Sequence, residues 1–179
     1  MLKKSIFFDF LNRRDGTDFN RFVVDSIEDE HYINWNQFLL PNDYGDAESE
    51  YLAIRNSCAL FDVSPLRKIQ VRGSGAGEFF DRLLTRPVSD LPIMRATYTV
   101  FCNQDGTFKD DAILYKYADD DYMLMPSDVD HSPYFESVCQ QFGLGNVAFT
   151  ECTDSWVGMA VQGPGSAAAL LEMGFSDVE

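Results

Sequence analysis

Apolar residues recur along the chain with two different periods, and each period predicts a different kind of element. Spacings of three and four residues indicate amphipathic helices over about 47–58, 75–86, 132–142 and 166–173. Alternating or short apolar runs predict strands at Lys68–Arg72, Ala96–Cys102, Ala112–Tyr117, Tyr122–Met125, Val147–Cys152 and Trp156–Val161. Short turns join the three middle strands, so these strands should be antiparallel neighbours. We therefore expect an α+β fold, an antiparallel sheet with covering helices.

Local signals set the ends of these elements. Asp46 can cap the first helix and Ser74 the second, and Pro87 should end the second. Residues 1–45 mix aromatic and charged side chains without a sustained period, which predicts an irregular N-terminal arm. Residues 46–179 should form one folded region.

Composition narrows the class of protein. The chain has 179 residues, of which 45% are hydrophobic, and this suits a packed globular protein of about one domain. Its net charge of −15 leaves no basic face to neutralise phosphates, so we expect no nucleic-acid partner.

The cysteines, the histidines and the N-terminal residues give no indication of a metal site or a signal peptide. The four cysteines form no CxxC pair and only two histidines are present, so we expect free thiols and no metal site. Asp9 interrupts the first apolar run, which is too short for a signal peptide. No apolar stretch approaches the roughly 20 residues of a membrane span. These features predict a cytoplasmic protein without a membrane partner.

Most other motifs have a structural explanation. Gly73–Phe80, GSGAGEFF, lacks the GxGxxG spacing of a nucleotide loop and predicts a tight strand-to-helix turn. His31 and His131 belong to no motif, and each is expected to be a surface or hydrogen-bonded histidine. No GxSxG element or Cys-His arrangement points to nucleophilic hydrolysis.

The pair Asp110-Asp111 is the strongest candidate for chemistry. Side chains alternate along a strand, so one carboxylate should stay in water and the other should face the apolar side. Acidic residues at strand ends often only cap turns, and this reading stays open. A carboxylate on a face lined by Tyr98, Tyr115 and Tyr117 could instead orient a nitrogen heterocycle or exchange protons with it.

Three segments in register resemble one known family. Ala53–Gly73 is similar to the R-x-x-x-x-x-FDVS…V-x-G segment of the aminomethyltransferase, or glycine-cleavage T-protein, superfamily. Ala96–Tyr117 resembles its Y-x-x-x-x-N-x-x-G-x-x-x-DD hairpin, and Ala160–Ser166 its QGP turn. Order and spacing agree from about Phe38 to the end of the chain.

This resemblance implies the first half of a tetrahydrofolate-binding enzyme that transfers one-carbon units. The second Asp of the DD pair, Asp111, would lie beside the reduced folate as the catalytic residue. Folate-pocket positions also map onto Leu66, Tyr98, Ile113 and Ser127. Family enzymes are about twice this long, so the resemblance implies a fragment or a truncated gene product that has little turnover alone.

Some residues depart from the family pattern, and these departures concern the molecule that donates the one-carbon unit. FDVSPL replaces the usual FDVSHM, Ser127 replaces an Asn, and Phe38–Pro41 replaces W-x-M-P. These changes count against a lipoyl carrier protein as partner. Leu39–Gly45, LLPNDYG, is more similar to the LLPxxFG of tetrahydrofolate-dependent dimethylsulfoniopropionate demethylases. We therefore expect a small methyl or aminomethyl donor, such as a sulfonium.

Two alternatives stay open from the sequence. One is a non-catalytic folate-binding accessory protein of the same superfamily, of the iron–sulfur assembly type. The other is an α+β interaction domain without either function. Oligomeric state is not indicated by any pattern.

Overall fold

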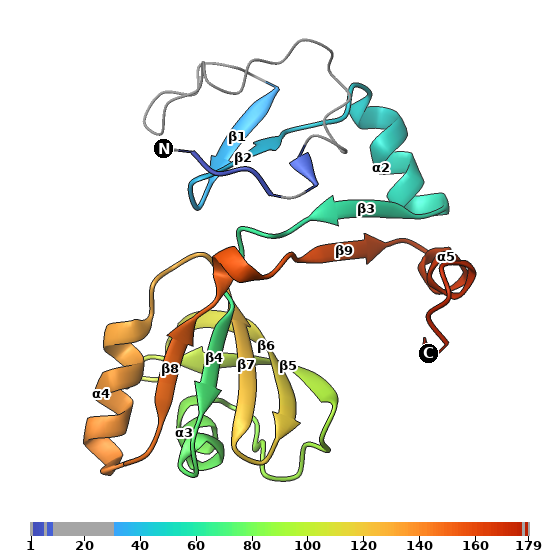
Figure 1. Cartoon of the computed structure of the whole chain (residues 1–179). Coiled ribbons are helices and arrows are strands. Elements are labelled where there is room, and N and C mark those ends of the chain that lie inside the picture. The colour runs from blue at the N-terminus through green and yellow to red at the C-terminus, as the bar shows by residue number, and fades with distance from the viewer. Residues whose placement is uncertain (1, 6, 9–30, 177, 179) are drawn as a thin grey trace. The chain divides into compact units, whose positions relative to one another are not determined.

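The computed structural model describes residues 2–5, 7–8, 31–176 and 178 (Figure 1). The chain divides into two compact units. Unit 1 comprises residues 1–65 and 157–179, and unit 2 comprises residues 66–156. Each unit has its own sheet or sheets.

Unit 2 is built on a five-stranded antiparallel sheet with the order β5-β6-β7-β4-β8. Its elements in chain order are β4 (Ile69–Arg72), α3 (Ala76–Leu83), β5 (Arg95–Cys102), β6 (Phe108–Ala118), β7 (Asp121–Pro126), α4 (Ser132–Phe142), β8 (Ala148–Glu151) and the 3₁₀ turn η2 (Thr153–Ser155). The strands β5, β6 and β7 are consecutive, and β4 lies between β7 and β8 because the chain returns to it after α4.

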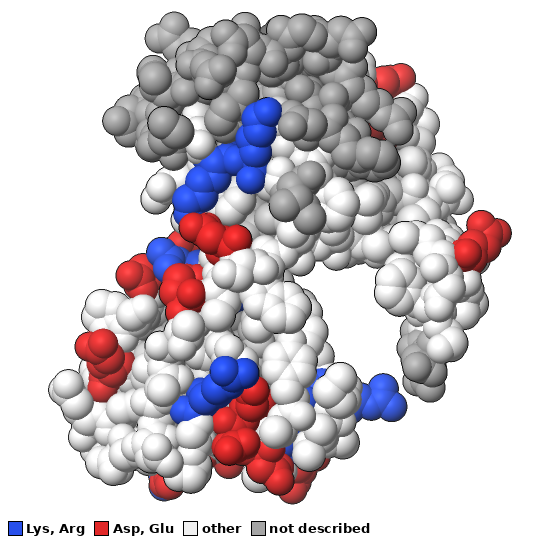
Figure 2. All heavy atoms as spheres, viewed as in Figure 1, with Lys and Arg blue, Asp and Glu red and all other residues white. Residues whose placement is uncertain are grey.

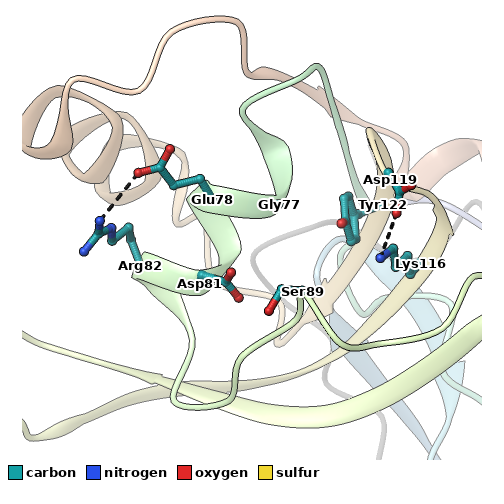
Figure 3. A pocket seen from close by; sticks show the side chains of 8 residues that line it. All are labelled: Gly77, Glu78, Asp81, Arg82, Ser89, Lys116, Asp119 and Tyr122. Atoms are coloured by element: carbon teal, nitrogen blue, oxygen red, sulfur yellow. Dashed lines mark ion pairs between the residues drawn. The ribbon is translucent and has the colours of Figure 1, made fainter.

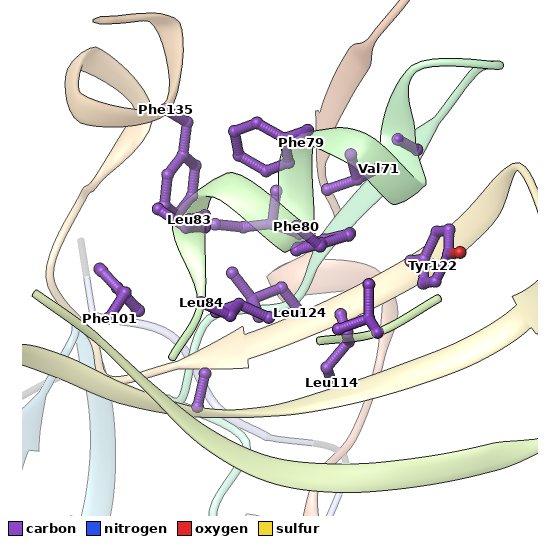
Figure 4. Packing of buried hydrophobic residues seen from close by; sticks show 14 of the residues in the cluster. Val71, Phe79, Phe80, Leu83, Leu84, Phe101, Leu114, Tyr122, Leu124 and Phe135 are labelled. Carbon is purple, nitrogen blue, oxygen red and sulfur yellow. The ribbon is translucent and has the colours of Figure 1, made fainter. Parts of the chain in front are cut away.

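Both helices of unit 2 pack on the same face of this sheet. Phe79 of α3 is fully buried and meets Phe80 and Phe135 edge-on (Figure 4). It meets Phe149 in the same way, and the ring centroids of the three pairs are 5.0 to 5.8 Å apart. Such edge-to-face pairs add to the stability that burial alone provides. The aromatic cluster therefore fixes α3 and α4 over one side of the sheet.

The turn from β4 into α3 depends on glycine. Gly73 has φ = +122°, and a Cβ atom there would lie 2.0 Å from the carbonyl oxygen of Asn146. A Cβ atom on Gly75 would lie 2.5 Å from the carbonyl oxygen of Gly145, so the two backbone segments can approach this closely because both glycines lack a side chain.

The described residues of unit 1 form two smaller sheets and the helices α2 and α5. Its elements are β1 (Tyr32–Trp35), β2 (Phe38–Pro41), α2 (Ala47–Asn56), β3 (Ala59–Asp62), β9 (Met159–Gln162) and α5 (Ser166–Glu172). The strands β1 and β2 form a hairpin, and β3 pairs with β9 in antiparallel register. The Asp46 side chain accepts a hydrogen bond from the backbone N–H of Ser49 and caps α2 as expected.

The α+β fold and all four helices are confirmed, and several details differ. Ser74 does not cap α3, whose N-cap is Gly75, and α3 ends at Leu83, before Pro87. The strand expected to start at Ala112 starts at Phe108, so both aspartates of the DD pair lie inside β6.

The expected irregular arm at 1–45 contains a hairpin at residues 32–41, and β3 was not predicted. Residues 1, 6 and 9–30 of that arm lie outside the described part of the chain. Among the described helices, none is long and apolar enough to cross a membrane.

Candidate functional site

The candidate site lies on the face of the unit 2 sheet opposite the two helices. Alternation along β6 turns Asp110, Ala112 and Leu114 toward the buried core. Asp111, Ile113 and Tyr115 therefore project to the other side. We call this side the open face, because Ile113 and the neighbouring Tyr98 are 38% and 61% exposed on it.

Strand register brings three of the expected folate residues together on the open face. Tyr98 of β5 pairs with Ile113 of β6, and Asp111 pairs with Val100 two residues further along β5. The Tyr98 hydroxyl donates a hydrogen bond to Oδ2 of Asp111 at 2.8 Å. This bond to the carboxylate is the main reason that the pKa of Tyr98 is raised, with burial a smaller cause. The phenol therefore stays protonated and holds the direction of the carboxylate.

Asp110 occupies a very different environment on the core side of the same strand. Its Oδ2 accepts hydrogen bonds from Ser127 Oγ at 2.6 Å and from the Ser127 backbone N–H at 3.3 Å, and it lies 2.7 Å from His131 Nε2. Burial would raise the pKa of Asp110. The hydrogen bonds from Ser127, His131 and the Asp111 backbone N–H outweigh burial, and together with the charge of His131 they lower this pKa.

The other two expected folate residues lie at the ends of strands. Ser127 follows β7, and its hydroxyl donates to Asp110 rather than to Asp111. Leu66 precedes β4 and is half-buried; the backbone N–H of the next residue, Arg67, donates to the carbonyl of Ser127 at 3.3 Å. The segments that carry Leu66 and Ser127 are thus adjacent, while the Ser127 hydroxyl is engaged on the core side.

Two residues of this region were not connected to the site by sequence reasoning. Met125 pairs with Ile113 in register and lies half-buried on the same open face. Period-two alternation along β7 could have indicated this. His131 was expected to be a surface or hydrogen-bonded histidine; it is buried and bonded, but its partner Asp110 is 21 residues away and no local pattern identifies it.

The open face offers the groups that a flat, nitrogen-rich ring requires. Tyr98, Ile113, Tyr115 and Met125 supply aromatic and apolar surface, and burial raises the pKa of Tyr115, so that it also stays a neutral phenol. Asp111 supplies one acceptor carboxylate held by Tyr98. Apolar walls with a few directed polar groups are typical of cofactor sites.

Two hollows lie elsewhere. One of about 440 Å³ lies beside α3 in unit 2 and is lined by Gly77, Glu78, Asp81, Arg82, Ser89, Lys116, Asp119 and Tyr122 (Figure 3). Four of its charged side chains form two ion pairs, Arg82 with Glu78 at 3.5 Å and Lys116 with Asp119 at 3.0 Å. A second, of about 340 Å³, lies in unit 1 against α2 and β3. Neither contains an expected folate residue.

Two further basic side chains of unit 2 form ion pairs. Arg67 lies 2.7 Å from Glu151 and Arg72 lies 3.0 Å from Asp121. Figure 2 shows acidic and basic side chains close together on the face that it draws.

Comparison with known proteins gives a consistent result. The family described as "GCVT N-terminal domain" matches residues 28–179. The chain is 35% identical over 160 residues to an aminomethyltransferase of Mycobacterium avium, a match that covers 86% of this chain and 43% of that protein. It is 29% identical over 177 residues to an aminomethyltransferase of Thermoanaerobacter pseudethanolicus, covering 99% of this chain and 44% of the relative.

A solved structure supports the same assignment. The glycine cleavage system aminomethyltransferase T from Bartonella henselae superposes with a TM-score of 0.70 at 26% identity. That match covers 83% of this chain and 41% of the other, so the chain spans less than half the length of the relatives it matches. By sequence and by structure, the chain belongs to the glycine-cleavage T-protein family, in which it corresponds to the N-terminal domain.

Proposed function

We propose that the open face of unit 2 is one wall of a tetrahydrofolate site in an enzyme that transfers a methyl or aminomethyl unit. The observation that carries this proposal is the Asp111 carboxylate, held by Tyr98 beside Ile113 on an aromatic and apolar sheet face. The names of the relatives, which are aminomethyltransferases, support the same class of reaction.

The residues of the open face fit a reduced folate chemically. Tetrahydrofolate, when bound, supplies the ring nitrogens that carry the one-carbon unit. Asp111 would accept hydrogen bonds from ring N–H groups and stabilise positive charge on the ring. Tyr98 keeps the carboxylate oriented, and Ile113 and Met125 offer apolar surface against which a flat ring can pack.

For the donor we propose a small methylated or aminomethylated compound, with a sulfonium as the first choice. The segment Leu39–Gly45, which resembles that of the demethylases, motivates this choice. The replacements at Pro65 and Ser127 argue against a lipoyl carrier protein as partner. An accessory protein that binds folate without transferring a group is the alternative, and it would show binding without turnover of any donor.

The test is a calorimetric titration of the full-length gene product with tetrahydrofolate, for the wild type and for Asp111→Asn. The substitution removes the charge from an acceptor that would face the cofactor, so we expect the Kd to rise about tenfold. Turnover with a sulfonium donor should fall at least as much. Asp120→Asn is the matched control, because it removes an equal charge from the exposed β6–β7 turn and should leave the Kd unchanged.

Two results would count against the proposal in different ways. An Asp111→Asn protein with wild-type affinity and turnover would remove Asp111 from the site. A folded wild-type protein that shows no saturable binding of tetrahydrofolate would contradict the folate assignment itself.

A further inference from the structure

We infer that His131 is a positioning residue of the folate-binding face and acts through Asp110 on Asp111 and Ser127. This inference rests on the proposed function, since it concerns how the proposed site is held. His131 itself lies on the core side of the sheet, at the N-terminus of α4, where it cannot touch a ligand on the open face.

Asp110 joins three segments of unit 2. On one oxygen, Oδ2, it meets the Ser127 hydroxyl, the Ser127 backbone N–H and His131 Nε2. On the other, Oδ1, it accepts the backbone N–H of Asp111 at 2.8 Å. The end of β7, the start of α4 and the next residue of β6 are therefore all bonded to a single carboxylate.

Burial makes each of these bonds matter. The side chains of Asp110 and His131 are only 8% and 7% exposed. The His131 ring lies edge-on to Phe101, with centroids 5.0 Å apart, and is tilted against Phe135 at 6.1 Å. In such apolar surroundings a carboxylate that loses a hydrogen-bond donor still carries the free-energy cost of its desolvation. Water or a movement of the remaining donors must then replace the lost hydrogen bond.

Those remaining donors lie at two expected folate positions. They are the backbone N–H of Asp111 and the two donors of Ser127. Loss of His131 should therefore displace the segments that carry Asp111 and Ser127, even though the changed side chain lies behind the sheet. The consequence is weaker cofactor binding that depends in part on Asp111 being present.

A double-mutant cycle in the full-length protein tests this inference, with tetrahydrofolate affinity measured by calorimetry. His131→Phe keeps an aromatic ring against Phe101 and removes the donor, so the Kd should rise about tenfold. His131→Gln places an amide nitrogen the same number of bonds from the backbone as Nε2 and should restore most of the affinity. In the Asp111→Asn background, His131→Phe should raise the Kd by a clearly smaller factor than in the wild type, because part of its effect passes through Asp111.

Tyr134→Phe is the matched control. It removes another hydrogen bond that ties α4 to the sheet, from the Tyr134 hydroxyl to the Cys102 carbonyl at 2.7 Å, without touching Asp110. Its Kd should stay within about twofold of the wild type, since a loss of general anchoring is not what the inference predicts.

Four outcomes would overturn the inference while leaving the proposed function intact. A folded His131→Phe protein could keep wild-type affinity for tetrahydrofolate, or its loss of affinity could be just as large in the Asp111→Asn background. His131→Gln could fail to restore the affinity, or Tyr134→Phe could lose as much affinity as His131→Phe. If His131→Phe does not fold, His131→Asn replaces it in the cycle, because Asn is a favoured N-cap whose shorter amide does not reach Asp110. A wild-type protein that does not bind tetrahydrofolate would defeat both the inference and the proposed function.

Discussion

Two neighbouring aspartates in β6 have separate tasks because a strand turns successive side chains to opposite faces. Asp110 is buried and bonded to Ser127 and His131, whereas Asp111 is half-buried beside the exposed Tyr98. Asp110 thus has the contacts of a structural group, and Asp111 has those of a group that can face a ligand.

Asp110 should make the free energy of unfolding depend on pH in the acidic range. Its pKa is lower in the folded protein than in the unfolded chain, where it is about 3.9. The stabilisation is therefore complete above the unfolded pKa and is lost as pH falls through the folded pKa. We expect Asp110→Asn to be less stable than the wild type at pH 6, and the difference to shrink below about pH 4. Denaturant unfolding across this pH range measures it.

A constant difference in unfolding free energy between wild type and Asp110→Asn, from pH 6 down to pH 3, would contradict this prediction. So would a difference that grows as the solution becomes more acidic.

Sequence alternation predicted one inward and one outward carboxylate at positions 110 and 111, but it could not say which was which. The direction depends on the register of β6 against β5 and β7, and on partners 17 and 21 residues away. The grouping of Tyr98, Asp111 and Ile113 came from a family resemblance, and the structure brings these three together. That they bind folate stays a prediction.

At the scale of elements, the connection between β4 and α3 is more demanding than its glycine-rich sequence indicates. Gly73 packs directly against the backbone of Asn146, just before β8, so a local turn also sets where β8 can lie beside β4.

We expect Gly73→Ala to lower the free energy of unfolding by roughly 3 kcal/mol or more, because its φ is positive and its Cβ would overlap backbone atoms. Gly106→Ala is the control: Gly106 also has positive φ, +83°, but a Cβ there meets nothing within 4 Å. That variant should lose only about 1 kcal/mol. Denaturant unfolding measures both, and equal losses would show that the contact with Asn146 contributes nothing.

Elements with a strong local period were predictable, and elements defined by distant partners were not. The helix at 132–142 matches α4 residue for residue, because its apolar spacing, the proline at its start and the following glycine agree. Strand β3 was not predicted because it is only four residues long and is defined by its pairing with β9, about 100 positions later.

At the scale of the whole molecule, net charge does not select a ligand. The chain carries −15, yet unit 2 contains several ion pairs at its surface, such as that of Arg67 with Glu151. What distinguishes the candidate site is a local arrangement on one sheet face. All five expected folate residues lie within unit 2, whose residues 66–156 are all described.

The central claim is that a reduced folate lies against the open face, and isoleucine methyl groups report on it directly. Ile113 projects to the open face, whereas Ile69 is buried on the helix-covered face of the same sheet. In methyl NMR spectra of the full-length protein titrated with tetrahydrofolate, the Ile113 signal should shift in a saturable way while that of Ile69 stays nearly fixed. Saturable binding that leaves Ile113 unmoved would contradict the account.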